Sequence, residues 1–512
     1  MRNKSMSSIM KLGLHALSRV RTLALIAMLA ELLLLFSPSA WAVPSYSRRY
    51  AVSCSTCHTM WGALNGAGVT FRLSGYRAIN GKLAKPETED LEIAKGVTIP
   101  TTLPLSFVTG VGYDYRTEDR QASNGTNSSS KGSSLNLEDA SIFMTSPLGE
   151  HLSAFVEFPM YETKAWEFTP TGKFEANNTG TGRHIQFQAE NPTFEVAKFF
   201  WNNLLNDSAP RDSVNLLAGI THLPLGYASG KVRLSVNQYL IYERRALDLI
   251  SPHKTSDVVG AADEHLFRLG EPQVLAEVMG MLTFGKPITD VSSRDTFWAE
   301  YHLGMSNGSN GKADNNTNKD LYGRWVMRYY NQSLGFSTYR SADSYDDNLR
   351  STAALGANPF GIMSGSQDAN KMTRNGIDFT LSLLPAGVPV WLENQLMYNR
   401  ESNPTGFGQE FKWHGGFHQL NWQPSKDYIV YGRYDYLKGD AYDDTMSLNN
   451  GVTGITKSKP SEWDTVVGVQ HLVNANTKLI AEYRHHYFED TATPVVAKLK
   501  DDGFTLRVMF GF

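Results

Sequence analysis

The sequence predicts an all-β transmembrane barrel of about sixteen antiparallel strands, preceded by a small α-helical segment. Three observations predict this fold. Many segments alternate apolar and polar residues with a period of two, which gives a strand two different faces. Short turns and long polar connections alternate along the chain, as they do on the two rims of an outer-membrane barrel. The composition combines 23 tyrosines, 25 phenylalanines and 43 glycines with a hydrophobic content of only 41%.

Residues 1–42 have the order of a secretory signal peptide. Basic residues come first, an apolar stretch of about fifteen residues follows, and Ala40-Trp41-Ala42 provides a cleavage site. The mature protein should therefore begin near Val43, outside the cytoplasm; the alternative is an amphipathic N-terminal helix. No later apolar run approaches the roughly twenty residues that a membrane helix needs. The net charge of −3 gives no indication of a nucleic-acid partner, and two cysteines cannot form a disulfide framework.

The last ten residues, GFTLRVMFGF, show the alternation most clearly. One face carries Phe504, Leu506, Val508, Phe510 and Phe512, and the other carries Thr505, Arg507, Met509 and Gly511. The apolar face suits lipid, and the face with an arginine suits the lumen of a barrel. In KLIAEYRHHYF the residues Glu482, Arg484 and His486 share one face. Further strands are predicted at 103–115, 296–306, 373–384, 388–399 and 461–473.

The connections between these strands alternate in length. Short turns are predicted at 147–151, 331–333, 384–388, 423–427 and 474–477, and long polar connections at 116–134, 306–320, 340–372 and 438–461. Residues 223–270 are too many for an ordinary loop, so we expect a large outer loop or one folded back into the lumen. A soluble β-sandwich or propeller is the alternative, but such folds bury one face in an aliphatic core.

The pentapeptide CSTCH contains the only two cysteines of the chain, Cys54 and Cys57, followed by His58. This spacing is that of c-type haem attachment. On a short helical turn both thiols could form thioethers to one haem c while His58 binds the iron as proximal ligand. Three alternatives remain. A thioredoxin-like dithiol needs a βαβ context, which the sequence does not show, and a zinc site needs four nearby ligands. A plain disulfide leaves His58 unexplained.

The residues after this motif suit a flat cofactor. Three glycines would let the backbone approach a macrocycle, and four apolar side chains could cover its faces. These residues are Gly66, Gly68 and Gly75, and Leu64, Phe71, Leu73 and Tyr76. The alternative is a short glycine-rich linker, which would leave the aromatic residues exposed.

Residues 50–77, YAVSCSTCHTMWGALNGAGVTFRLSGYR, resemble the N-terminal segment of the fused monohaem cytochrome–porins of iron-oxidising bacteria. The matching residues are Cys54, Cys57, His58, Leu64, Asn65, Gly68, Phe71, Gly75 and Tyr76, whereas Gly62 stands where the family has proline. The resemblance implies an outer-membrane protein that transfers electrons from extracellular Fe(II), through one haem c, to a periplasmic c-type cytochrome. The alternatives are a transport porin with a structural or sensory haem segment, and a conduit that runs outward to an external acceptor.

The predicted organisation is a signal peptide (1–42), a monohaem cytochrome c segment (43–100) and a barrel (101–512). Residues 43–100 are too few for a comfortable core of their own, so we expect the segment to plug the periplasmic mouth of the barrel. Its sixth iron ligand is unknown: it could be absent, the Val43 amine, or a lumen residue such as His302 or Met509. The alternative for His302 and Met509 is that each is an ordinary lumen-facing strand residue with no ligand role.

Three acidic pairs, Asp346-Asp347, Asp443-Asp444 and Asp501-Asp502, fall in predicted outer loops. Carboxylates suit hard cations such as Fe(II), although such pairs more often keep loops solvated.

Overall fold

A computed structural model describes most of the chain from Ser45 onward. The described residues are 45–50, 52–53, 56–60, 63–77, 90–101, 104–121, 127–164, 188–189, 195–205, 208–227, 233–250, 267–284, 297–310, 317–343, 370–404, 410–444, 456–474, 476–491 and 497–511. All of them belong to one compact unit, Val43–Phe512. The predicted signal peptide, Val43 and Cys54 lie outside the described residues.

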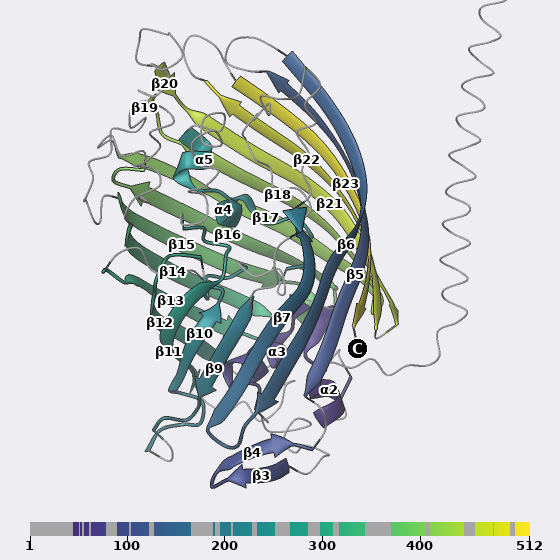
Figure 1. Cartoon of the computed structure of the whole chain (residues 1–512), viewed down its shortest axis with the longest axis vertical. Coiled ribbons are helices and arrows are strands. Elements are labelled where there is room, and N and C mark those ends of the chain that lie inside the picture. Colours follow the sequence, from purple (N-terminus) through teal and green to yellow (C-terminus); the bar gives the residue numbers. More distant parts are fainter. Residues whose placement is uncertain are drawn as a thin grey trace, which may run out of the picture. The chain divides into compact units, whose positions relative to one another are not determined.

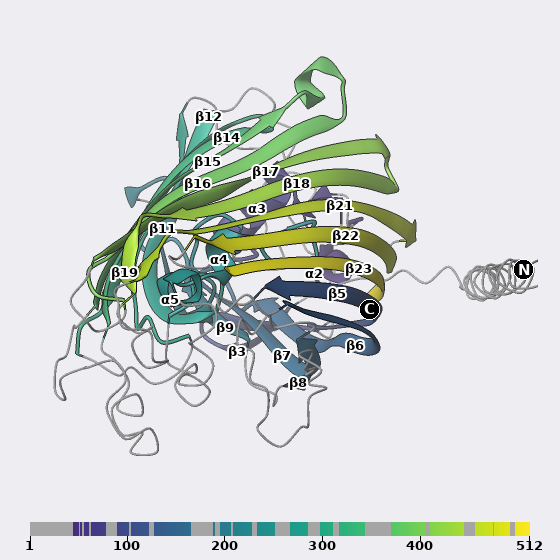
Figure 2. The ribbon, with the colours of Figure 1, turned by 90° about the horizontal axis from the view of Figure 1, so that it is seen from above.

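The described strands close into a barrel of 16 antiparallel strands, as the sequence predicts (Figures 1 and 2). In chain order they are β5 (Leu105–Gln121), β6 (Asn127–Pro147), β7 (Leu152–Lys164), β9 (Val196–Trp201), β10 (Asn215–Thr221), β11 (Gln273–Phe284), β12 (Phe297–Ser306), β13 (Asp320–Tyr329), β14 (Gln332–Asp343), β15 (Asn370–Ser382), β16 (Val390–Glu401), β17 (Phe411–Ser425), β18 (Tyr428–Gly439), β21 (Pro460–Asn474), β22 (Thr477–Asp490) and β23 (Ala497–Gly511). The last strand, β23, pairs with β5 and closes the ring. The two-residue strand β8 (Gln188–Ala189) extends the pairing of β7.

The strands divide into lumen and lipid faces as the period of two predicts. On β22 the even-numbered residues Glu482, Arg484 and His486 are buried inside the barrel, whereas Tyr483 is 47% exposed on the outside. Large apolar side chains such as Leu303, Leu420 and Val467 are exposed on the outer face, all by more than half. A closed barrel with an apolar outer face is the architecture of an outer-membrane protein.

One rim carries the short connections. The two residues between β13 and β14 and the seven between β15 and β16, which include the 3₁₀ turn η6 (Leu384–Ala386), match the predicted turns. The barrel also begins and ends on this rim, because Val108 near the start of β5 pairs with Gly511. By the usual orientation of such barrels, the short-turn rim is the periplasmic one.

Two predictions about connections are wrong. Most of the polar stretch 116–134 belongs to β5 and β6, which extend far beyond the apolar alternation. Asp501 and Asp502 lie within β23 instead of a loop, and Asp501 accepts hydrogen bonds from Arg116 of the neighbouring strand β5. Backbone pairing continues beyond the membrane, where polar side chains carry no apolar signal. Asp443 and Asp444 are in the short strand β19 (Tyr442–Asp444), which pairs with β20 (Thr456–Ser458), and Asp346-Asp347 lies outside the described residues.

The connection from β10 to β11 folds into the lumen, the second of the two arrangements expected for 223–270. Its helices α4 (Leu240–Glu243) and α5 (Ala246–Ile250) lie inside the ring of strands (Figure 2). Tyr239, Leu240, Ile241 and Tyr242 are completely buried. None of the helices in the described part of the chain is long and apolar enough to cross a membrane.

The residues before the barrel form α2 (Ser45–Tyr50), the two-stranded sheet β1 (His58–Met60) and β2 (Ala63–Leu64), α3 (Gly66–Leu73), and the hairpin β3 (Asp90–Ala94) and β4 (Val97–Pro100). Helix α2 packs against β6, and α3 packs against β11. Both helices are drawn in purple at the lower end of the barrel in Figure 1.

Candidate functional site

The described part of the CSTCH motif begins at Thr56. Cys57 lies in a turn and His58 starts the strand β1, so the helical turn expected over this motif does not extend to His58. Asn65 holds the motif to α3: its backbone N–H donates to the Cys57 carbonyl at 3.0 Å, and its side-chain amide donates to the Thr56 carbonyl at 3.2 Å. The Asn65 side-chain oxygen also accepts from the Gly68 N–H at 3.0 Å and so caps α3.

The glycines after the motif have different surroundings. A Cβ at Gly68 would collide with the Cys57 carbonyl oxygen, so the motif and α3 can approach this closely only with glycine. Gly75, at φ +67°, faces Asn202 and Ser153 of the barrel, and a Cβ at Gly66 would meet nothing within 4 Å. Only Gly68 therefore makes the close approach at the motif itself.

The predicted cover residues pack the segment onto the barrel. Phe71, Leu73 and Tyr76 are at most 8% exposed. Tyr46 stacks on Tyr76 with a centroid distance of 5.2 Å, and Tyr76 stacks in turn on Phe155 of β7, also at 5.2 Å. Burial raises the pKa of the Tyr46 hydroxyl well above its usual value. These aromatic side chains therefore tie α2 and α3 to the inner wall.

A buried ion pair fixes the end of the segment. The guanidinium of Arg77 contacts Asp212 in the connection between β9 and β10, and donates to the carbonyls of Glu150 at 2.5 Å and Ser74 at 2.9 Å. Burial raises the pKa of Asp212 although Arg77 opposes the rise, and burial lowers the pKa of Arg77. Asn215, the first residue of β10, donates to the Leu73 carbonyl at 3.0 Å. The described residues between 45 and 77 thus rest against lumen-facing residues and turns of the short-turn rim.

A second polar cluster lies on the neighbouring wall, on β11, β12 and β13. His302 is 4% exposed, and its Nδ1 lies 3.2 Å from a carboxylate oxygen of Glu277. Tyr322 donates to the other Glu277 oxygen at 3.0 Å. The Nε2 of His302 is buried and makes no hydrogen bond to any described residue. The prediction that His302 faces the lumen is therefore confirmed; Met509, the other candidate, sits opposite Lys478 on β22.

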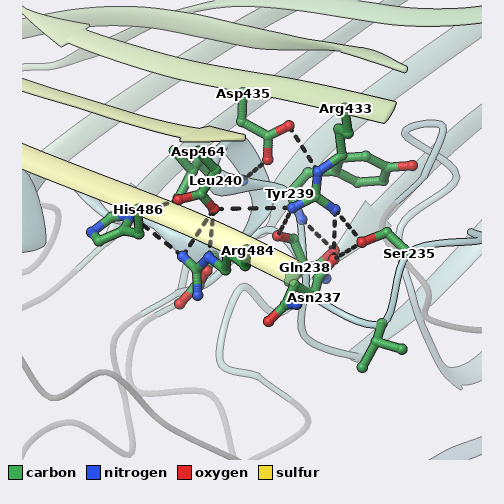
Figure 3. Close-up of polar contacts among 12 residues, drawn as sticks. Ser235, Asn237, Gln238, Tyr239, Leu240, Arg433, Asp435, Asp464, Arg484 and His486 are labelled. Carbon is green, nitrogen blue, oxygen red and sulfur yellow. Dashed lines mark hydrogen bonds and ion pairs between the residues drawn. The ribbon is translucent and has the colours of Figure 1, made fainter. Parts of the chain in front are cut away.

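The inward loop is anchored by a network of charges on the opposite wall (Figure 3). Arg433 donates to Ser235 at 2.8 Å and to the Asn237 carbonyl at 2.7 Å, and its guanidinium lies 4.7 Å from the centre of the Tyr239 ring. Asp435 accepts from the Leu240 N–H at 3.2 Å.

The same network continues along β21 and β22. Asp464 accepts from Arg484 at 2.9 Å and from His486 at 2.6 Å. Arg244 of the loop makes a bidentate contact with Glu462, from Nη2 to Oε1 at 2.7 Å and from Nε to Oε2 at 3.0 Å. The loop also reaches β16, where Gln395 donates to the Leu225 carbonyl at 3.1 Å. These contacts hold the loop across the lumen.

The sequence did not indicate Glu277, Arg77 or Asp212, because their roles depend on which strands become neighbours. No group of three His, Cys, Asp or Glu side chains in the described residues could hold a metal ion by itself. A haem needs only the thiols of the motif and one or two axial ligands from the chain. The close approach at Gly68 and the unbonded Nε2 of His302 fit such a group.

The sequence matches no protein-family model and no curated protein. Solved structures of outer-membrane barrels match at low identity. The outer-membrane channel DcaP of Acinetobacter baumannii has 10% identity and a TM-score of 0.43, over 80% of this chain and 96% of that one. An anion-selective porin from Comamonas acidovorans has 10% identity and a TM-score of 0.44, over 80% and 98%. OprB of Pseudomonas putida has 10% identity and a TM-score of 0.41, over 79% and 94%.

Proposed function

We propose that this protein is an outer-membrane electron conduit that oxidises extracellular Fe(II) through one haem c and passes the electrons to a periplasmic c-type cytochrome. Cys54 and Cys57 would hold the haem through thioether bonds, and His58 would be its proximal iron ligand. The haem supplies the one-electron chemistry when it is bound. The residues of the chain bind it, orient it and set how much water reaches it.

One observation carries the proposal: the segment that contains the motif packs inside one end of a closed barrel. Arg77 and Leu73 contact the rim and inner wall through Asp212 and Asn215. The aromatic stack from Tyr46 through Tyr76 adds an apolar contact. A cofactor on Cys57 would therefore lie within the barrel end and not on a separate domain in the periplasm. Such a position supports contact with a periplasmic partner on one side and with the lumen on the other.

The lumen loop supports electron transfer more than solute transport. Tyr239, Leu240 and Tyr242 are fully buried among lumen-facing residues such as Gln395 and Gln419. The buried ion pair of Arg244 with Glu462 holds this loop against β21. Hydrogen bonds of Ser235 with Arg433 and with Glu482 hold it against β18 and β22. An electron needs no open path, whereas a hydrophilic solute needs a hydrated one. A barrel whose lumen is crossed by a buried, anchored loop therefore suits electron transfer better than the passage of a hydrophilic solute.

A solute channel is the second candidate function, and the strand number favours it. Barrels of sixteen to eighteen strands are wide enough to leave an aqueous channel, and this barrel has 16 strands. In that case the segment at residues 45–77 would act as a structural plug or a sensor.

Purified protein in detergent separates the two functions. Haem content is measured first from the pyridine haemochrome spectrum, with Cys57→Ala as the variant that should lose covalent haem. Fe(II) is then added without oxygen. Rapid growth of the reduced haem α-band supports the conduit. A haem that does not respond to Fe(II), together with steady ion conductance in a planar bilayer, would support the channel instead.

A further inference from the structure

We propose that His302 is the sixth ligand of the haem iron, opposite His58, with Glu277 and Tyr322 as positioning residues. This inference rests on the proposed function, because it assumes a haem on the CSTCH motif. It goes further by naming the distal ligand, which the motif itself does not specify.

The protonation of the His302 ring follows from its partner. A carboxylate has no proton to give, so His302 Nδ1 must be the donor in its 3.2 Å contact with Glu277. In the neutral ring the lone pair then lies on Nε2, the atom with no hydrogen bond to any described residue. A histidine that donates one N–H to a carboxylate and presents its other nitrogen is the usual arrangement of a metal-ligating histidine.

Packing fixes the positions of Glu277 and of Tyr322, which donates a hydrogen bond to it. Tyr322 crosses from β13 to reach Glu277 on β11, and it passes over Gly304 of the strand between them. A Cβ at Gly304 would collide with the Tyr322 ring. Glu277 and Tyr322 are both buried, at 6% and 4% exposure. The orientation of the His302 ring is therefore determined by neighbours on three strands.

His302 lies on the part of the barrel wall next to the C-terminal end of α3, and the motif contacts the N-terminal part of this helix. Asn215, which binds the Leu73 carbonyl, pairs with Met279, and Met279 pairs with His302. His302 is therefore two strands, about 10 Å, from the residue that holds the end of α3. The other end of this helix, near Gly68, touches the Cys57 carbonyl. An eight-residue helix is about 12 Å long, so α3 spans the interval between the motif and the wall that carries His302.

The charged residues around α3 also place this helix beside the strand that carries His302. Burial lowers the pKa of Arg72, the residue before Leu73, and the nearby carboxylate of Glu300 opposes that change. Glu300 is the lumen-facing residue on β12 that immediately precedes His302 on the same face. The face of β12 next to α3 is therefore the face that carries His302.

Among the described residues, His486 is another buried lumen histidine, and carboxylates face both of its ring nitrogens. His486 has Asp464 on Nδ1 at 2.6 Å and Glu462 on Nε2 at 3.4 Å, within the network that anchors the loop. Its strand places it nine residues beyond the short-turn end of β22, whereas His302 is five residues from the corresponding end of β12. His302 is the better placed of the two for a group held near that rim.

The test uses the full-length holoprotein in detergent and reads the ferric haem by absorption and electron paramagnetic resonance. Wild type should be six-coordinate and low-spin. His302→Ala should become high-spin, and added imidazole should restore the low-spin spectrum by filling the vacated ligand space. His418→Ala, on an exposed histidine, and Met509→Leu, on the other candidate, should leave the spectrum unchanged.

Glu277→Gln gives a readout that a purely structural role would not change. Loss of the carboxylate makes the imidazole a weaker donor to ferric iron, so the reduction potential should rise while the haem stays low-spin. A high-spin wild type, or a His302→Ala variant with the wild-type spectrum, would overturn the assignment of His302 and leave the proposed function standing. Wild-type protein without covalent haem would instead refute the proposed function itself.

Discussion

The Arg77–Asp212 pair allows a quantitative test of how the motif segment is held. Replacing Arg77 by methionine keeps much of the side-chain volume but leaves the Asp212 carboxylate, at 4% exposure, with only the more exposed Arg211 at 3.5 Å as an ion-pair partner. Breaking a buried ion pair from one side costs about 3–5 kcal/mol. If the segment undocks as a local unit, its open population should rise by about 150- to 5,000-fold.

The effect should depend on pH in a defined direction. Burial raises the pKa of Asp212, and Arg77 opposes that rise. A raised folded-state pKa means that the favourable contribution is present at low pH and is lost as the pH rises through that value. Without Arg77 the pKa should rise further. Arg77→Met should therefore undock little in acid, where Asp212 is protonated, and much more at mildly alkaline pH.

Hydrogen exchange in detergent measures this undocking directly. The amides of Val69 and Ser74, which donate to Asn65 and Thr70 within α3, report the segment, and amides of β17 report the barrel. The double variant Arg77→Met/Asp212→Asn removes both charges and should recover most of the protection. Unchanged exchange of α3 in Arg77→Met, or no recovery in the double variant, would refute the account of this pair.

Three further predictions concern the segment and the lumen loop. Gly68→Ala should destabilise the motif segment by about 1–3 kcal/mol and lower haem content, because its Cβ meets the Cys57 carbonyl, whereas Gly66→Ala has free space and should retain wild-type haem content. Arg244→Met should release the loop from Glu462 and raise single-channel conductance above that of wild type; unchanged conductance would contradict the anchoring role. Burial opposes ionisation of Asp248, yet Arg245 lowers its pKa to about 2, so its contribution to α5 is present above its usual pKa of 3.8 and is lost as the pH falls through about 2. Exchange protection of α5 should therefore persist in mild acid in wild type but be reduced in Asp248→Asn at neutral pH.

Strand faces could be predicted from the sequence because they depend only on local alternation. The lumen positions of His302 and of Glu482, Arg484 and His486 follow from counting residues along one strand. The extent of β5 and β6 could not be predicted, because their outer parts consist of polar residues on both faces. Pairing there is maintained by backbone hydrogen bonds, which any sequence can make.

Contacts between strands depend on register, which the sequence does not display. Glu277 and Tyr322 become neighbours of His302 only because β11 and β13 flank β12 in one particular register. The same limitation applies to Arg77 and Asp212, which are separated by 135 positions. The length of residues 223–270 predicted an unusual connection, but its inward path depends on buried partners such as Asp435 and Glu462 on distant strands.

The central claim is that electrons cross the barrel through one covalently attached haem. The most direct measurement places the purified protein in vesicles that contain an oxidised c-type cytochrome, and adds Fe(II) outside without oxygen. The account predicts reduction of the enclosed cytochrome in vesicles with wild-type protein and none in vesicles with Cys57→Ala. Equal reduction with both proteins, or none with haem-loaded wild type, would contradict it.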